Sequence, residues 1–142
     1  MSEAALTLTY DQLVKLGEGL AALDGLRTKP GEFEPFLFNP DTTWAIAENA
    51  TVVTGKLKTY AGAKKSLAVQ HKITEGMAVS PENSASVAAF MAGLDELNER
   101  AVEVDGLQRI SREKLNVGHD VKKQQNRIPP SVLARLQPIL EA

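Results

Sequence analysis

Residues 41–73 read DTTWAIAENATVVTGKLKTYAGAKKSLAVQHKI, and this stretch decides the fold because apolar residues recur in it every seven positions. One row of the repeat holds Ile46, Val53, Tyr60 and Leu67, and the interleaved row holds Ala50, Leu57, Lys64 and His71. Spacings that alternate between four and three are typical of a helix that packs along another helix. We therefore predict a helix over residues 42–73 whose packing side is apolar in its first half and polar at its far end.

A second long helix is predicted over residues 80–101. Gly76 ends the first helix, and Ser80-Pro81 begins the next with a capping residue followed by proline at the first helical position. Apolar residues again step by three and four, at Val87, Phe90, Leu94, Leu97, Ala101 and Val104. Two such helices joined by a short loop predict a long antiparallel hairpin, folded about residue 77.

This fold point sets the register of the hairpin. It places Tyr60 opposite Leu94, Leu57 opposite Leu97, Leu67 opposite Val87, and Lys64 beside Phe90. It also places the basic residues of the first helix alongside the acidic residues of the second: Lys56, Lys58, Lys64 and Lys65 alongside Asp95, Glu96 and Glu99. We expect these opposite charges to neutralise each other across the hairpin.

A shorter helix is predicted before the hairpin, over residues 9–24. Thr9 and Gln12 have the spacing of a capping box, and Asp24-Gly25 is a typical helix stop. One stripe of this helix is apolar: Leu13, Leu16, Leu20 and Leu23. Gly17 and Gly19 each weaken it by about 1 kcal/mol relative to alanine, so the helix depends on packing.

Three of the four phenylalanines lie in a loop predicted over residues 29–41, at Phe33, Phe36 and Phe38. Pro35 argues against a central strand, so we predict at most an edge strand around Phe36–Phe38. The aromatic cluster is interpreted as a plug over one end of the core, and the alternative is a partner-binding surface.

Two readings remain open for residues 102–110. Val102 and Val104 alternate with Glu103, and Asp105-Gly106 is a hairpin turn signal, so either the second long helix continues through Val104 or a short β-hairpin begins there. The alternation favours the hairpin. Ser111 is expected to cap a short turn that ends near Leu115, and residues 116–127, NVGHDVKKQQNR, are expected to form an exposed polar and basic linker.

A last helix is predicted within residues 128–142, opened by Ile128-Pro129-Pro130-Ser131 and ended by Pro138. Its apolar side holds Val132, Leu133, Leu136, Ile139 and Leu140. A helix this short needs a groove to stabilise it, either on its own chain or on a neighbouring subunit. We expect exchange between subunits, with Leu133, Leu136 and Leu140 as partner contacts.

Composition is that of one ordinary globular domain: 142 residues, of which 43% are apolar and 24% charged, with a net charge of -2. The predicted fold is mainly α, with a helical core over residues 1–115, the linker over 116–127 and a docking helix over 128–142. No stretch has the roughly 18 apolar residues of a membrane span, and the start lacks the pattern of a signal peptide. We therefore expect no membrane contact and no secretion by signal peptide.

Nothing in the sequence predicts an enzyme. The chain has no cysteine, and its two histidines, His71 and His119, do not form a helix-spaced pair. No HExxH motif, glycine-rich phosphate loop or GxSxG motif is present. Asn49 and Asn83 are interpreted as surface and capping groups. We predict no catalytic residue, no cofactor and no metal site.

A basic run over residues 109–127 is the one candidate for nucleic-acid contact. Its phosphate-binding candidates are Arg109, Arg112, Lys122, Lys123 and Arg127. The run lacks interleaved aromatic residues on which bases stack. A solvated linker that meets the acidic block at residues 82–105 is the favoured interpretation, so a nucleic-acid partner is not favoured.

Three stretches together resemble small phage and prophage proteins of unknown function: LTYDQLVKLGEGLAALDGL near the start, WAIAEN where the long helix begins, and EVDGLQRI with IPPSVLARLQPIL near the end. The resemblance implies a leading helix, a long helical hairpin, a Val-Glu-Val-like strand and a viral context, but no chemistry. With it we expect a non-enzymatic structural or assembly protein, in the host cytoplasm or the virion, that contacts a protein partner or other copies of itself. The alternatives are a phage protein that blocks a host factor and a small nucleic-acid binder acting through residues 109–127.

Overall fold

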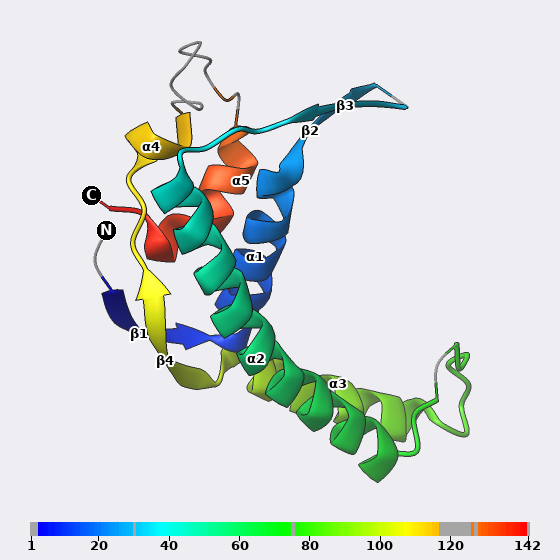
Figure 1. Cartoon of the computed structure of the whole chain (residues 1–142). Helices are drawn as coiled ribbons and strands as arrows, with labels where there is room; N and C mark the ends of the chain where they lie inside the picture. Colours follow the sequence, from blue (N-terminus) through cyan, green and yellow to red (C-terminus); the bar gives the residue numbers. More distant parts are fainter. Residues whose placement is uncertain (1–2, 30, 75, 117–125, 127, 142) are drawn as a thin grey trace.

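The computed structural model describes residues 3–29, 31–74, 76–116, 126 and 128–141. The chain is mainly helical, as predicted, and the described part also contains two small antiparallel sheets of two strands each. Figure 1 shows a body, built around the first helix, and an arm that projects from it. We use "arm" for residues 61–99, which form the end of one long helix, the loop after it and the whole of the next helix.

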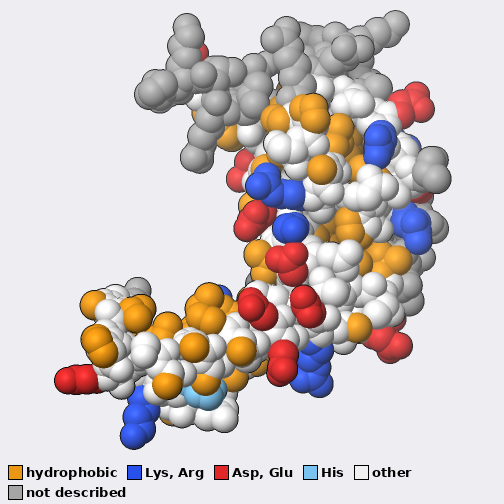
Figure 2. Space-filling view, turned by 180° about the vertical axis from the view of Figure 1, so that it is seen from behind, with side chains coloured by type: hydrophobic (Ala, Val, Ile, Leu, Met, Phe, Trp, Pro, Cys, Tyr) orange, Lys and Arg blue, Asp and Glu red, His pale blue; other side chains and the backbone are white. Residues whose placement is uncertain are grey.

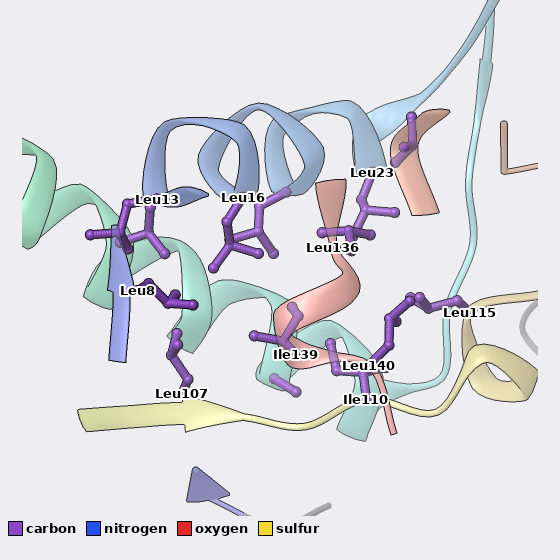
Figure 3. Close-up of a cluster of buried hydrophobic side chains, with 14 of the residues drawn as sticks. Leu8, Leu13, Leu16, Leu23, Leu107, Ile110, Leu115, Leu136, Ile139 and Leu140 are labelled. Atoms are coloured by element: carbon purple, nitrogen blue, oxygen red, sulfur yellow. The ribbon is translucent and has the colours of Figure 1, made fainter. Parts of the chain in front are cut away.

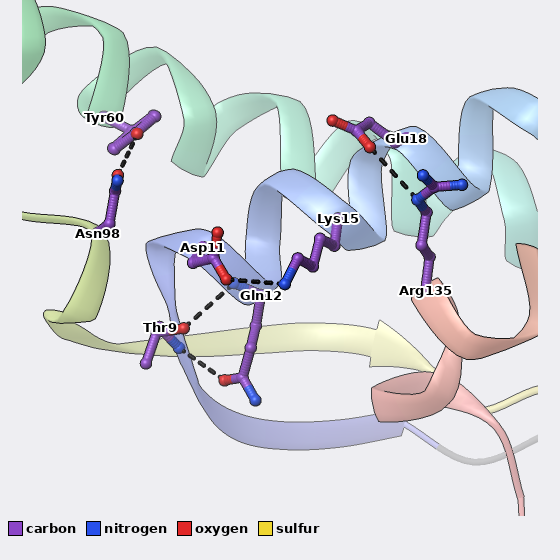
Figure 4. Close-up of polar contacts among 8 residues, drawn as sticks. All are labelled: Thr9, Asp11, Gln12, Lys15, Glu18, Tyr60, Asn98 and Arg135. Atoms are coloured by element: carbon purple, nitrogen blue, oxygen red, sulfur yellow. Dashed lines mark hydrogen bonds and ion pairs between the residues drawn. The ribbon is translucent and has the colours of Figure 1, made fainter. Parts of the chain in front are cut away.

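The body begins with strand β1 (Glu3–Thr9), which leads directly into helix α1 (Tyr10–Ala21). The predicted capping box is confirmed: the Thr9 hydroxyl accepts from the Gln12 N–H at 3.1 Å, and the Gln12 side chain accepts from the Thr9 N–H at 2.9 Å (Figure 4). A 3₁₀ turn (Ala22–Asp24) ends the helix. Gly25 then has an extended backbone, so it starts a strand instead of forming the left-handed cap that its position suggested.

Strand β4 (Ala101–Gln108) replaces both alternatives that were left open for residues 102–110. It pairs antiparallel with β1, so that Thr9 lies opposite Ala101 and Glu3 opposite Gln108. Asp105 and Gly106 together face one residue of β1 and form a bulge, with Gly106 at a φ of 86°. The prediction of a local β-hairpin is therefore wrong. Gly106 forms a bulge in β4, whose partner strand β1 lies about a hundred residues earlier in the chain.

The second sheet lies just after α1. Strand β2 (Gly25–Lys29) pairs antiparallel with strand β3 (Glu32–Pro35), and Gly25 lies opposite Pro35. The edge strand therefore comes earlier than the predicted Phe36–Phe38. Phe36 instead follows the strand, and its N–H donates to the carbonyl of Asp24 at 3.1 Å.

The two long helices are α2 (Pro40–Gln70) and α3 (Ser84–Glu99). The first matches the prediction, and Asn39 caps it by accepting from the Thr42 N–H at 2.9 Å. The second begins four residues later than Ser80. The Asn83 side chain accepts from the Ser80 N–H at 2.7 Å and donates to the Ala78 carbonyl at 2.9 Å, so Pro81 lies in a turn before the helix.

The longer loop shifts the register of the hairpin. The Tyr60 hydroxyl donates to the Asn98 side chain, four residues beyond the predicted Leu94. Leu67 lies against Gly93, with a methyl 3.1 Å from where a Cβ would stand, six residues beyond the predicted Val87. Leu57 packs against Gly17 of α1. A register that is four to six residues later also moves Leu57 away from the predicted level of Leu97, and Lys64 away from that of Phe90.

The core of the body joins α1, β4 and the C-terminal segment (Figure 3). The C-terminal segment contains α5 (Pro130–Arg135) and a 3₁₀ turn (Gln137–Ile139). The Ile110 N–H donates to the Ile139 carbonyl at 2.9 Å, and the Glu141 N–H donates to the Ile110 carbonyl at 3.0 Å. The large, fully buried aliphatic side chains of this core are Leu13, Leu16, Leu107, Ile110, Leu115, Leu136 and Ile139.

In the structure the C-terminal segment packs on its own chain, in place of the exchange between subunits that the sequence predicted. The groove that receives it lies between α1 and β4, not on the hairpin. Leu136 and Leu140 are core residues instead of partner contacts, and Leu133 is half-buried beside them. An ion pair between Arg135 and Glu18, at 3.3 Å, also joins α5 to α1 (Figure 4).

Two buried asparagines join parts of the body that are distant in sequence. Asn49 of α2 accepts from the Gln108 N–H at 2.6 Å and donates to the Gln108 carbonyl at 2.9 Å. Asn126 accepts from the Leu37 N–H at 3.0 Å and donates to the carbonyls of Leu37 and Leu115 at 2.8 and 3.0 Å. Both were predicted to be exposed, Asn49 as a surface group and Asn126 as part of the linker.

Most of the predicted linker, residues 117–125 and 127, lies outside the described residues. At its start, helix α4 (Arg112–Asn116) confirms the predicted short turn, because the Ser111 hydroxyl accepts from the Lys114 N–H at 3.1 Å. Leu115 of this helix is buried in the core.

At Gly19, helix α1 and the end of α5 approach each other closely. A Cβ on Gly19 would stand 3.0 Å from the Cβ of Arg135 and 3.0 Å from a methyl of Leu136. We expect Gly19→Ala to lower the free energy of unfolding by about 1–3 kcal/mol through overpacking, despite the better helix propensity of alanine. Gly55→Ala, on α2 with no atom within 4 Å, is the matched control and is expected to raise it by about 0.5–1 kcal/mol. Equal effects of the two changes in chemical denaturation would contradict the close packing of α1 on α5.

Candidate functional site

The arm is the candidate site because it has no buried core of its own. No side chain of α3 is buried, and the buried residues of α2 all lie in its first half: Thr42, Ala45, Asn49 and Val53. Large apolar side chains on the arm face solvent, with Val69 71%, Val79 67% and Met91 49% exposed. Figure 2 shows hydrophobic side chains along the arm and acidic ones near its junction with the body.

The sequence of the arm explains this surface. The first eleven residues of α3, Ser84–Leu94, contain no charged residue. Its exposed positions in that span include Met91 and four alanines, Ala85, Ala88, Ala89 and Ala92. Leu67, Phe90 and Leu94 are only half-buried, because just two helices are available to cover them. The stretch Ser84–Leu94 of α3 thus presents an uncharged surface of small and apolar side chains, which suits close packing against another protein.

In the arm and at its base, the basic residues lie mainly on α2 and the acidic residues on α3. Between Asn49 and Thr74 the chain has five lysines and no acidic residue, whereas Asp95, Glu96 and Glu99 follow one another on α3. In the described part of the chain no carboxylate lies within 4 Å of Lys56, Lys58, Lys64 or Lys65. Lys64 lies instead over the ring of Tyr60, with its Nζ 5.2 Å from the ring centre. The ion pairs that the sequence predicted across the hairpin therefore do not form within this chain.

Tyr60 fixes the base of the arm to the body. Its ring stacks on Tyr10 of α1, with centres 5.0 Å apart, and its hydroxyl donates to Asn98 (Figure 4). Burial raises the pKa of the Tyr60 hydroxyl above its ordinary 10.0, and the negative charge of Asp11 raises it further. The hydroxyl therefore keeps its proton, and can donate this hydrogen bond, at neutral pH.

The predicted aromatic cluster divides into two parts. Phe36 is buried and Phe38 half-buried, with ring centres 6.4 Å apart, and both pack on the core. For these two rings the interpretation as a plug over one end of the core is confirmed. Phe33 lies on β3 and is 50% exposed.

The predicted phosphate contacts are only partly described. Arg109 is half-buried, and Arg112 donates to the Gln137 side chain at 2.9 Å. Lys122, Lys123 and Arg127 lie outside the described residues, as does His119. Of the five named cations, the structure therefore describes only Arg109 and Arg112.

Two of the grooves that the described residues form on the body are of interest for binding. One, of about 690 Å³, is bounded by β1, α1 and α5, and its two cations, Lys15 and Arg135, are paired with Asp11 and Glu18. The other, of about 650 Å³, runs between α1 and α2 and is lined mainly by small and aliphatic residues. Across the described residues no three histidine or carboxylate side chains gather as a metal site would need. The lining of neither groove supplies a nucleophile with an adjacent base.

None of the helices in the described part has the length and apolarity needed to cross a bilayer. Comparison of the chain with protein-family models, with curated proteins and with solved structures found no match. The exposed surface of the arm is therefore the candidate functional site.

Proposed function

We propose that this protein is a non-enzymatic structural or assembly protein of a phage or prophage, and that it acts through protein–protein contacts made by the arm. The observation that carries the proposal is a sixteen-residue helix, α3, in which no side chain is buried. Most helical stability in proteins comes from packing of an apolar face, so such a helix is stabilised when a partner covers it. The phage context rests on the sequence resemblance, and the contact role rests on the arm.

The experiment is genetic. Deletion of the gene from a phage or prophage that carries it is expected to reduce the yield of particles, and the wild-type gene supplied in trans restores it. We expect a Val69→Asp, Met91→Asp variant to fail in this complementation, with a yield more than about tenfold lower, because each buried carboxylate without a partner costs several kcal/mol.

The matched control is Ser131→Asp, which adds the same charge at an exposed position in the first turn of α5, where aspartate is favourable. Circular dichroism should show the folded body in all variants. A normal particle yield from the deletion, or from the double aspartate variant, would contradict the proposal.

The alternative role, blocking of a host factor, predicts a different outcome in the same experiment. A blocking protein is dispensable for particle formation in a host that lacks its target, and it binds one host protein tightly. A nucleic-acid role through residues 109–127 predicts loss of activity from Arg109→Ala with Arg112→Ala, with the arm variant unaffected. The exposed arm favours a protein-contact role over the nucleic-acid role, and the particle yield of the deletion separates assembly from blocking.

A further inference from the structure

We propose that the surface covering the arm is the arm of a second copy of this chain, which lies alongside the first and points the same way, about a two-fold axis that runs along the arms. The proposal rests on the contact role given to the arm above, and it names the partner. It is carried by the placement of charges on the arm, by the level at which they lie and by the uncharged surface beyond them.

The charged residues described on one arm are complementary to those of a second arm and do not pair with each other within one chain. Lys64 and Lys65 of α2 are exposed, as are Asp95 and Glu96 of α3, and the described part of the chain provides none of the four with an ion-pair partner within 4 Å. Each copy therefore offers one basic helix and one acidic helix. In a two-fold pair the same patch serves on both sides, so the basic helix of each copy can meet the acidic helix of the other.

The four residues lie at about the same level of the arm. Tyr60 bonds to Asn98 and Leu67 packs on Gly93, which places Lys64 and Lys65 roughly opposite Asp95 and Glu96. A two-fold axis parallel to the arms keeps each residue at its level and exchanges the two helices, so it brings the lysines of one copy to the carboxylates of the other. The pairs form twice, once on each side of the axis.

The same axis also covers the uncharged stretch Ser84–Leu94 of α3. The end of α2 lies about six residues, or roughly 9 Å, beyond the charged level. Because Leu67 packs on Gly93, Val69 and Met91 lie at about the same level of the arm. The axis exchanges the two helices at that level, so the exposed Val69 of each copy comes to the exposed Met91 of the other.

The test is sedimentation equilibrium of the full chain and of two charge-reversed variants. The wild type is expected to have twice the 15.3 kDa mass of the chain at micromolar concentration. Lys64→Glu with Lys65→Glu, and separately Asp95→Lys with Glu96→Lys, should each raise the dissociation constant by about 10- to 100-fold, because like charges then face each other. Lys114→Glu and Glu113→Lys, at exposed positions on α4, are the matched controls and should leave the dimer intact.

An equimolar mixture of the two reversed variants is the decisive sample. In one variant both helices are acidic at this level, and in the other both are basic, so the two variants attract each other and the mixture should regain the dimer mass. A charge effect within a single chain would be unchanged by mixing. A monomeric wild type at 100 μM, dimers that persist in both variants, or a mixture that stays monomeric would each overturn the pairing.

These outcomes are separable from failure of the assembly role. A monomeric wild type whose arm variant still loses particle formation would reject the second copy as partner and keep the assembly role. A dimer that depends on the four charges, in a protein that proves dispensable for particles, would keep the pairing and reject the assembly role.

Discussion

A chain that ends at Arg127 is expected to be unfolded. Removal of residues 128–142 takes five buried apolar side chains from the core: Ile128, Val132, Leu136, Ile139 and Leu140. At about 1.5–3 kcal/mol each, their combined contribution is roughly 7–15 kcal/mol, which equals the whole stability of a typical domain. Circular dichroism and thermal unfolding test this, and a truncated chain that unfolds cooperatively near the wild-type temperature would contradict it.

Two point variants test whether the C-terminal segment stabilises the fold through the side chains that it buries. Leu136→Ala removes a fully buried side chain and is expected to cost about 2–5 kcal/mol. Leu133→Ala, three residues away and only half-buried, is the matched control and is expected to cost about 1 kcal/mol. Similar losses from both variants in urea denaturation would mean that the segment does not dock as described.

Replacement of Asn49 by alanine is expected to cost about 2–4 kcal/mol. The side chain is fully buried and satisfies both the N–H and the carbonyl of Gln108 at the end of β4. Alanine leaves both backbone groups without their partner, and an unsatisfied buried group costs about 1–3 kcal/mol. The free energy of unfolding from urea denaturation measures the loss.

The control is Glu48→Ala, the exposed neighbour on the same helix, which is expected to change stability by less than about 0.5 kcal/mol. Asn49→Asp adds a second comparison. Its carboxylate can still accept from the Gln108 N–H but cannot donate to the carbonyl, so it should be no more stable than the alanine variant. If Asn49→Ala matches the Glu48 control, the asparagine does not join α2 to β4.

Local signals in the sequence were enough to predict the helices. The Thr9 and Gln12 capping box, the leucine stripe of α1 and the heptad rows of α2 are each encoded within a few turns of chain, and all three appear in the structure. Residues near Ser80 and Pro81 misled the prediction, because a side chain of Asn83 that bonds backward into the loop delays the start of α3. That delay of four residues was enough to move the hairpin register.

Long-range partners could not be read from the sequence in the same way. The dipeptide Asp105-Gly106 is compatible both with the turn of a β-hairpin and with a β-bulge within a strand. The bulge forms because β4 pairs with β1, which lies far away in the sequence. Asn49 and Asn126 look like surface residues because their partners are backbone groups, which leave no mark on side-chain patterns. The tail residues Leu136 and Leu140 were correctly seen to need a groove, but which chain supplies the groove depends on packing.

The candidate site was predictable only in part. The apolar rows of α3 indicated a face that must be covered, and Phe90 and Leu94 are half-buried. The sequence could not show that two helices cover this face incompletely, or that Val69, Val79 and Met91 would remain exposed. Exposure is a property of the assembled fold, so the arm became a candidate only from the structure.

Amide hydrogen exchange, measured by mass spectrometry at nanomolar and at high micromolar concentration, tests most directly whether the arm depends on a partner. Core segments around residues 13–20, 104–110 and 132–140 should be protected at both concentrations, because their side chains are buried within the chain. Residues 84–94 should exchange much faster than the core in the dilute sample and gain protection in the concentrated one. Protection of residues 84–94 equal to that of the core in a dilute monomer would contradict the account.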